Sequence, residues 1–172
     1  MKSDKQILQN TQQYEFVRLL NEHQPLIYKV CNLYGHTLTD REDLFQEIVV
    51  QLWKAYPRFR GDSKFSTWLY RIALNTAISG LRKKRDHIAS FEPEKLPTDI
   101  QEETYSDEKE NQLQQMYSGI RQLSEIERAL VMLYLEDKSY EEMEEILGIN
   151  QNNLRVKMNR IKEKLRKLVK PC

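Results

Sequence analysis

The stretch FSTWLYRIALNTAISGLRKKR, residues 65–85, decides the fold of the first half of the chain. Its apolar residues recur every three or four positions, which is the spacing of one packed face of an α-helix. Side chains at that spacing are neighbours on a helix, and a second face of the stretch is polar, carrying Arg71, Asn75, Ser79 and Arg82. The sequence therefore predicts an amphipathic helix with a continuous polar face.

The same stretch ends in a cluster of cations. It contains Arg71 and the basic run 82–85 but no acid, so its five bases give a local charge of +5. Cations bind phosphates, the Trp68 ring can stack on a base, and the Asn75 amide can read a base edge. This combination favours a nucleic acid as the ligand. An ordinary amphipathic helix with a solvated basic end is the alternative.

The composition is that of a helix-rich protein without membrane insertion. Of the 172 residues, 31% are charged and 40% hydrophobic, with only 5 Gly and 5 Pro, which suits one medium domain or two small helical ones. No apolar run is long enough to span a bilayer, and the N-terminus lacks the apolar core of a signal peptide. We therefore expect a cytoplasmic protein.

The cysteines and histidines do not indicate a metal site or a disulfide. Cys31 and Cys172 are far apart in sequence, and there is no Cys-x-x-Cys or Cys/His cluster. His23, His36 and His87 are not spaced as metal ligands. The sequence predicts neither a metal nor another cofactor.

The net charge of +1 hides a strong segregation of charge. Residues 86–115 hold nine acids against two lysines, a charge of −7, whereas residues 151–172 hold eight bases against one acid, a charge of +7. Helical periodicity also fails from about 91 to 112, where Pro93 and Pro97 fall among the acids. The sequence predicts a domain at 1–90, an acidic linker at 91–112 and a second domain at 113–172.

Two further helices precede the basic stretch. The first is predicted at about 12–34, with Pro25 starting a new turn or kinking it. The second is predicted at about 41–55, capped by Thr39 or Asp40, with its apolar side facing inward through Leu44, Phe45, Ile48, Val49, Leu52 and Trp53. Its other side is either solvated or an acidic docking surface for a basic partner helix, and carries Asp43, Gln46, Glu47 and Gln51.

A loop joins the second of these helices to the basic stretch. Pro57 and Gly61 break the helical pattern between Tyr56 and Ser63. Ser63 or Ser66 is a candidate N-cap for the helix that follows, because a serine hydroxyl can accept a hydrogen bond from the first amides of a helix.

The second domain contains the pattern of a helix-turn-helix. Ser124 with Glu127, and Ser139 with Glu142, each form a Ser-x-x-Glu capping box. Gly148 would end a short helix, and Asn150 would cap a longer one whose inward side carries Leu154, Met158, Ile161, Leu165 and Leu168.

The outward side of that longer helix is polar and basic, with Asn152, Asn153, Arg155, Lys157, Asn159, Arg160 and Lys164. Asparagine and arginine are the side chains that read adenine and guanine in the major groove. A duplex-DNA reader is the prediction, and a plain helical hairpin with a basic surface is the alternative.

Taken together in order, these parts resemble the sigma-70 family of bacterial RNA polymerase initiation factors, in its small extracytoplasmic-function (ECF) group. DREDLFQEIVVQLW at 40–53 is similar to the family's helix for docking on the polymerase clamp. FRGDSKFSTWLYRIALN at 59–75 is similar to its strand-opening and −10 segment, and residues 139–168 are similar to its −35 reader. The resemblance implies an all-α fold of two small helical domains, region 2 and region 4, joined by a flexible acidic linker.

The resemblance also assigns roles to residues. Asp43, Gln46, Glu47 and Gln51 would dock on core RNA polymerase. The −10 element and its opening would fall to Phe59, Arg60, Lys64, Phe65, Trp68, Arg71, Asn75, Arg82, Lys83, Lys84 and Arg85. The −35 element would be read by Asn152, Asn153, Arg155, Lys157, Arg160 and Lys164.

The implied partners are promoter DNA, an anti-sigma factor, the clamp of the largest polymerase subunit and the flap of the second-largest, with the free protein a monomer. Two positions depart from the family's pattern. Glu144 stands where a small residue is usual, and Asn153-Leu154-Arg155 replaces the commoner Thr-Val-Lys.

Two other classes of protein are alternatives to this one. A two-domain regulator that binds duplex DNA without polymerase would account for residues 139–168, but not for the acidic helix or the 59–85 segment. A nucleic-acid-processing enzyme would need paired carboxylates, a phosphate-binding glycine loop, a nucleophile elbow or a metal cluster, and the sequence shows none of these motifs. We therefore expect a protein that is not an enzyme.

Overall fold

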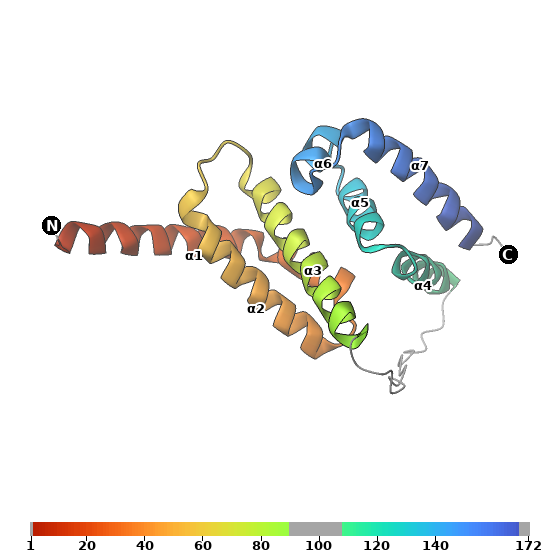
Figure 1. Cartoon of the computed structure of the whole chain (residues 1–172), viewed down its shortest axis with the longest axis horizontal. Coiled ribbons are helices and arrows are strands. Elements are labelled where there is room, and N and C mark those ends of the chain that lie inside the picture. Colours follow the sequence, from red (N-terminus) through yellow and green to blue (C-terminus); the bar gives the residue numbers. More distant parts are fainter. Residues whose placement is uncertain (1, 90–107, 169–172) are drawn as a thin grey trace. The chain divides into compact units, whose positions relative to one another are not determined.

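The computed structural model describes residues 2–89 and 108–168, and within these ranges every regular element is helical. This confirms the predicted all-α fold. The helices, labelled in Figure 1, are α1 (Lys2–Tyr34), α2 (Leu38–Ala55), the short 3₁₀ helix η1 (Tyr56–Arg58), α3 (Phe65–Ala89), α4 (Glu108–Arg121), α5 (Glu125–Leu135), α6 (Tyr140–Leu147) and α7 (Gln151–Leu168). No helix in these ranges is long and apolar enough to cross a bilayer.

The chain forms two compact units, Met1–Ala77 and Ile78–Cys172, and the division falls inside α3. The first unit contains α1, α2, η1 and the first half of α3. Residues 91–107 of the predicted linker lie outside the described residues. Helix α4 begins at Glu108, so residues 108–112 of the predicted linker are helical.

Helix α1 is longer than the sequence predicted. It begins at Lys2 rather than near Gln12 and continues through Pro25 to Tyr34, and Figure 1 shows its N-terminal turns extending past α2. A proline lacks the amide that would donate to the carbonyl four residues earlier, which here belongs to Asn21. Because Asn21 and Pro25 are both exposed, water can satisfy that carbonyl and the helix does not end.

The turn between α1 and α2 corrects the predicted cap. Helix α2 begins at Leu38, and its N-cap is Thr37 rather than Thr39 or Asp40. The Thr37 hydroxyl accepts from the Asp40 amide at 3.0 Å, and the Asp40 carboxylate accepts from the Thr37 amide at 3.2 Å. Asp40 therefore contributes as the third helical residue of a capping box.

The core of the first unit comes from all three of its long helices. Six of its fully buried side chains are Ile27, Ile48, Leu52, Leu69, Tyr70 and Leu74. The predicted inward side of α2 is correct at Ile48 and Leu52 but wrong at Trp53, which is 44% exposed. The Trp53 ring instead covers Phe16 from the outside, with the ring centres 5.0 Å apart.

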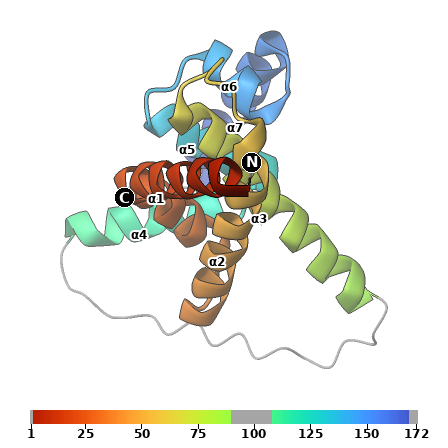
Figure 2. The same cartoon turned by 90° about the vertical axis from the view of Figure 1, so that its left-hand side faces the viewer.

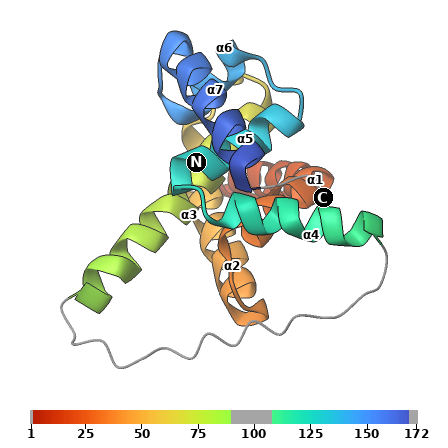
Figure 3. The same ribbon diagram turned by 90° about the vertical axis from the view of Figure 1, so that its right-hand side faces the viewer.

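In the second unit, α4, α5 and α7 contact one another and α6 packs on α7 (Figures 2 and 3). Both predicted capping boxes are present, at Ser124 and Ser139. Gly148 ends α6 in the left-handed conformation, with φ of 69°, which glycine adopts without steric cost.

The Asn150 side chain caps α7 by accepting from the amides of Asn152 and Asn153, at 2.8 and 3.3 Å. Leu154, Met158 and Ile161 are buried, as predicted. Leu168 is 45% exposed, because it lies in the last turn of α7, where only one side of the helix is covered.

Candidate nucleic-acid interface

An aromatic cluster lies where the loop after η1 meets the start of α3. The Phe59 ring is 4.9 Å from the Trp68 ring and 5.7 Å from the Phe65 ring, and the last two are 5.3 Å apart. All three are half-buried. Their packing holds the loop against the helix while leaving part of each ring open for stacking on a base.

The backbone of the loop explains how the sequence builds this cluster. The Phe59 amide donates to the Tyr56 carbonyl at 3.0 Å and closes the η1 turn. Gly61 then takes a φ of +76°, in the left-handed region. The Trp68 amide donates to the Lys64 carbonyl at 3.1 Å. Lys64, and not Ser63 or Ser66, therefore occupies the N-cap position of α3.

The polar face predicted on α3 is exposed. Arg71 and Asn75 lie three and seven residues after Trp68, so they follow it along one side of the helix over two turns, roughly 10 Å. Arg60 and Lys64 of the loop are also exposed, as are the cations Arg82, Lys83, Lys84 and Arg85 further along α3. The structure thus brings the aromatic rings, the Asn75 amide and the cations of the predicted −10 set onto one loop and helix.

Helix α2 presents the predicted acidic side. Asp43, Gln46 and Glu47 are exposed, and the half-buried Gln51 amide donates to the Glu47 carboxylate at 2.7 Å. Val50, three residues after Glu47, is 43% exposed on the same side. Val50 was not predicted as a site residue, although it follows Gln46 by four residues and Glu47 by three, the spacing of one helix face. A mixed acidic and apolar surface suits a protein partner.

Helix α7 exposes five of its predicted DNA-reading residues: Asn152, Asn153, Arg155, Lys157 and Arg160. The guanidinium group of Arg155 makes two contacts within the second unit. One guanidinium nitrogen donates to the side-chain amide oxygen (Oδ1) of Asn152 at 3.4 Å, and the guanidinium carbon lies 4.9 Å from the centre of the Tyr140 ring. Tyr140, the first residue of α6, was not among the predicted site residues.

Val156 was also missed. Its side chain is 49% exposed, on the side of α7 opposite the buried Leu154 and Met158. An exposed aliphatic group amid asparagines and arginines can contact the methyl group of thymine in the major groove. Val156 could have been predicted as a site residue, because it is the apolar residue within the otherwise polar outward side of the helix.

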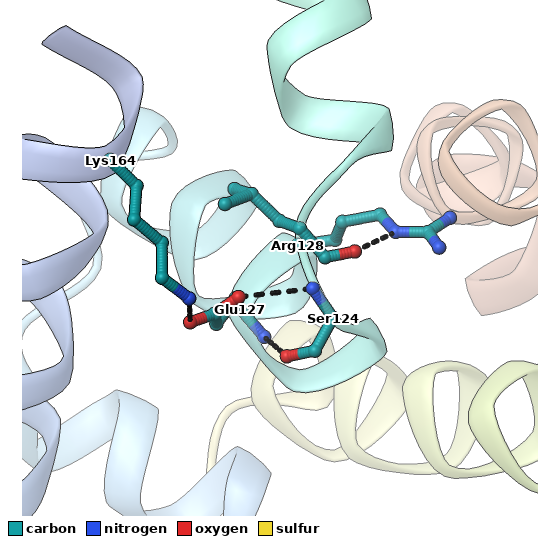
Figure 4. A network of polar contacts seen from close by, with 5 residues as sticks. Ser124, Glu127, Arg128 and Lys164 are labelled. Carbon is teal, nitrogen blue, oxygen red and sulfur yellow. Dashed lines mark hydrogen bonds and ion pairs between the residues drawn. The ribbon is translucent and has the colours of Figure 1, made fainter. Parts of the chain in front are cut away.

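Lys164 differs from the rest of the predicted −35 set. Its ammonium lies 2.5 Å from the Glu127 carboxylate of α5 (Figure 4). Glu127 also accepts from the Ser124 amide at 3.0 Å, completing the capping box. Burial by itself would raise the pKa of Glu127, but the hydrogen bonds from Lys164 and Ser124 and the Lys164 charge outweigh it and lower that pKa. Lys164 therefore links α7 to the start of α5.

Two neighbouring contacts support the same packing. The Arg128 guanidinium donates to the Leu123 carbonyl at 3.1 Å, next to the Ser124 cap (Figure 4). The Lys162 ammonium lies 4.6 Å from the Tyr134 ring centre and 3.2 Å from its hydroxyl. Lys162 and Lys164 of α7 thus both contact α5.

Among residues 2–89 and 108–168, no cluster of three or more His, Cys, Asp or Glu side chains could hold a metal ion. Cys31 is buried in the core of the first unit, and burial raises the pKa of its thiol to about 11. This cysteine is a packing residue, and its thiol stays protonated at neutral pH.

These features define a two-part, all-helical DNA-binding protein, with an aromatic and basic loop-helix segment in one part and a helix-turn-helix in the other. The sequence matches the family models of Sigma-70 region 2 over residues 19–87 and Sigma-70 region 4 over residues 113–165, which together cover more than half of the chain. The chain belongs to the sigma-70 family, in its extracytoplasmic-function group.

Similar proteins extend over nearly the whole chain. The RNA polymerase sigma-H factor of Pseudomonas aeruginosa is 28% identical, covering 98% of this chain and 94% of the relative. The ECF RNA polymerase sigma factor SigW of Bacillus subtilis is 29% identical, covering 88% and 87%. The function is that of the family: a transcription initiation factor that directs RNA polymerase to promoters.

Two solved structures share the fold. The sigma factor RpoE of Bartonella quintana, in complex with the anti-sigma factor NepR, superposes with a TM-score of 0.71 at 21% identity, covering 90% of this chain and 96% of that one. CnrH, in complex with the cytosolic domain of CnrY, gives 0.62 at 23% identity, covering 91% and 88%.

Proposed function

We propose that three surfaces of this chain divide the work of promoter recognition. The loop from Phe59 to Phe65 and the exposed face of α3 capture the −10 strand. The outward side of α7 reads the −35 duplex. The acidic side of α2 docks on the clamp of the largest polymerase subunit, and region 4 contacts the flap of the second-largest.

One observation supports the −10 assignment above the others. The half-buried rings of Phe59 and Trp68 contact each other, and the exposed Arg71 and Asn75 follow Trp68 along the same side of α3. A single strand leaving a duplex needs aromatic faces for its bases and cations for its phosphates, and this surface offers both within two helical turns.

The energetics require polymerase as a partner in opening the DNA. Unstacking one base step costs on the order of 1–2 kcal/mol, and stacking one captured base on an aromatic ring returns about 1–3 kcal/mol. A cluster of three half-buried rings can therefore hold one or two bases but not a whole bubble. We expect no autonomous melting by the free chain.

The remaining parts of the proposal concern partners and place of action. The solved relatives named above are complexes with the anti-sigma factor NepR and with a domain of CnrY, and we propose an anti-sigma factor for this chain that covers the acidic side of α2 or the DNA-binding faces. The free chain is a monomer that acts in the cytoplasm, where polymerase and DNA are found, without catalysing a reaction itself.

The test is co-migration of the purified chain with core RNA polymerase that lacks a sigma factor. Asp43→Lys and Glu47→Lys should each weaken binding at least about tenfold, because a like charge would face a basic partner helix. Glu22→Lys makes the same change of charge at an exposed position of α1 and should leave binding unchanged. If the wild type binds duplex DNA tightly but not core polymerase, the docking proposal is wrong.

A further inference from the structure

Two residues of α1 adjoin Tyr56, the first residue of η1, which precedes the Phe59–Phe65 loop. Phe16 is only 4% exposed, and its ring centre lies 5.1 Å from that of Tyr56. The neighbouring Glu15 carboxylate raises the pKa of the Tyr56 hydroxyl through its charge and its capacity to accept a hydrogen bond. Both α1 residues precede residue 19, where the match to the region 2 family model begins. Both α1 residues therefore lie outside the segment that matches the family model.

Tyr56 in turn contacts both of the rings proposed to capture a base. Its ring is stacked on that of Phe59, with centres 6.4 Å apart and planes 22° apart, and it meets the edge of Trp68 at 6.4 Å. Its carbonyl also accepts the Phe59 amide at 3.0 Å. The Tyr56 side chain thus connects α1 to Phe59 and Trp68.

We propose that Tyr56 is a positioning residue for promoter opening, held by Glu15 and Phe16 of α1 so that Phe59 and Trp68 are pre-arranged to receive a base. This inference rests on the proposed role of the Phe59 loop in capturing the −10 strand. It adds a role for the N-terminal helix, which no part of that proposal used.

The loop needs such support because it has little packing of its own. Its residues at 60, 61, 62 and 64 are exposed, so few buried contacts restrain them. A loop that must be ordered at the moment of binding loses conformational entropy then, whereas a pre-arranged loop has already lost it on folding. A contact that fixes Phe59 and Trp68 therefore favours strand capture without touching DNA.

The protonation state of Tyr56 suits an interaction with Glu15 that does not change with pH. Burial, and then the charge and hydrogen bond of Glu15, raise the pKa of Tyr56, and the Arg18 charge opposes them only in part. The hydroxyl therefore stays protonated throughout the physiological range of pH and is available as a donor to the Glu15 carboxylate. The ring and the hydroxyl can be tested separately, since Tyr56→Phe removes only the donor.

The first experiment measures the order of the cluster in the free chain and needs neither polymerase nor DNA. The chain has two tryptophans, so Trp53→Phe leaves Trp68 as the only one. In this background, Glu15→Ala and Tyr56→Phe should each make Trp68 fluorescence more easily quenched by acrylamide. The double variant should be no worse than either single one, because both changes remove the same contact.

Two control variants separate positioning from a general loss of structure. Glu15→Gln keeps an acceptor for the Tyr56 hydroxyl and should behave as the parent protein. Tyr14→Ala changes a neighbouring α1 residue that is 80% exposed and should also have no effect. The melting temperature should change little in all of these variants.

The second experiment measures open-complex formation by the reconstituted holoenzyme, at a promoter first mapped by run-off transcription of genomic fragments. Glu15→Ala and Tyr56→Phe should slow opening by about threefold to tenfold, the equivalent of one hydrogen bond, with affinity for core polymerase unchanged. Glu15→Gln should restore the rate.

The two experiments separate the failure of this inference from that of the proposed function. Unchanged quenching of Trp68, or altered quenching with a normal rate of opening, would overturn the positioning role of Tyr56. A wild-type chain that fails to bind core polymerase would instead overturn the docking and promoter-opening proposals, while the quenching result would still report on the Glu15–Tyr56 contact.

Discussion

The guanidinium group of Arg155 on α7 lies over the ring of Tyr140 on α6, with its carbon 4.9 Å from the ring centre. Fifteen residues separate the two along the chain, and the turn at Gly148 brings them together. A cation over an aromatic face gains about 0.5–1 kcal/mol at an exposed site. The contact holds the side chain proposed to read the −35 element before any DNA arrives.

Replacing Tyr140 should therefore weaken −35 binding without touching DNA directly. We expect Tyr140→Leu to lower the affinity of holoenzyme for promoter duplex by about twofold to fivefold, in line with the loss of one cation–π contact. Tyr140→Phe keeps the ring and should bind as the wild type does. Titration of labelled promoter duplexes with substituted −35 elements checks both, and equal affinities for the leucine and phenylalanine variants would contradict the prediction.

The Glu127–Lys164 pair makes the stability of the second unit depend on pH. Because the pKa of Glu127 is lower in the folded chain than its usual value, its stabilising contribution is present at neutral pH and is lost as pH falls through that lowered pKa. We expect Glu127→Gln to cost about 0.5–1 kcal/mol at pH 7, because it removes the charge pairing with Lys164 while glutamine can keep the capping box, and to cost less in acid. Thermal unfolding of both proteins between pH 7 and pH 3 measures the difference, which should shrink as the pH is lowered.

Lys157 and Lys164 should behave differently although both are exposed cations of α7. Lys157→Met should weaken DNA binding and reduce the slope of log affinity against log salt concentration by about one, as expected for a phosphate contact. Lys164→Met should leave that slope unchanged and lower the melting temperature, because Lys164 is paired with Glu127. A reduced salt slope in Lys164→Met would restore Lys164 to the −35 set.

Gly35 is required for the close approach of α1 and α2. A Cβ atom there would lie 2.5 Å from the Arg41 Cγ and 2.9 Å from the Cys31 carbonyl oxygen. We expect Gly35→Ala to destabilise the first unit by about 2 kcal/mol, a typical cost of overpacking. Adding Arg41→Ala should recover only part of the loss, because the contact with the Cys31 backbone remains.

Gly80 provides the matched control for that substitution. It lies inside α3, and a Cβ atom there would meet nothing within 4 Å. Gly80→Ala should therefore stabilise the chain by about 0.5–1 kcal/mol through the better helix propensity of alanine. Denaturant unfolding of the two variants should show shifts of opposite sign.

The sequence alone determined the helical fold class, both serine capping boxes, the Gly148 turn and the Asn150 cap of α7. These features could be predicted because their partners lie within four residues, so the pattern of side chains and the local hydrogen bonds carry the same information. The predicted cap of α2, Thr39 or Asp40, lies two or three residues beyond the observed Thr37. The helix before residue 12 was not predicted, because the side chains of residues 4–11 are all exposed and leave no apolar stripe to detect.

Only the tertiary structure decided which exposed residues are occupied by other parts of the chain. Lys164 looks like its neighbours on α7 in the sequence, but its partner Glu127 lies 37 residues away. The contacts of Tyr140 with Arg155, and of Tyr56 with Phe16, likewise join different helices. Helical periodicity tells which side of a helix faces outward, but not which atoms of another helix meet it there, because that depends on how the packed helices cross.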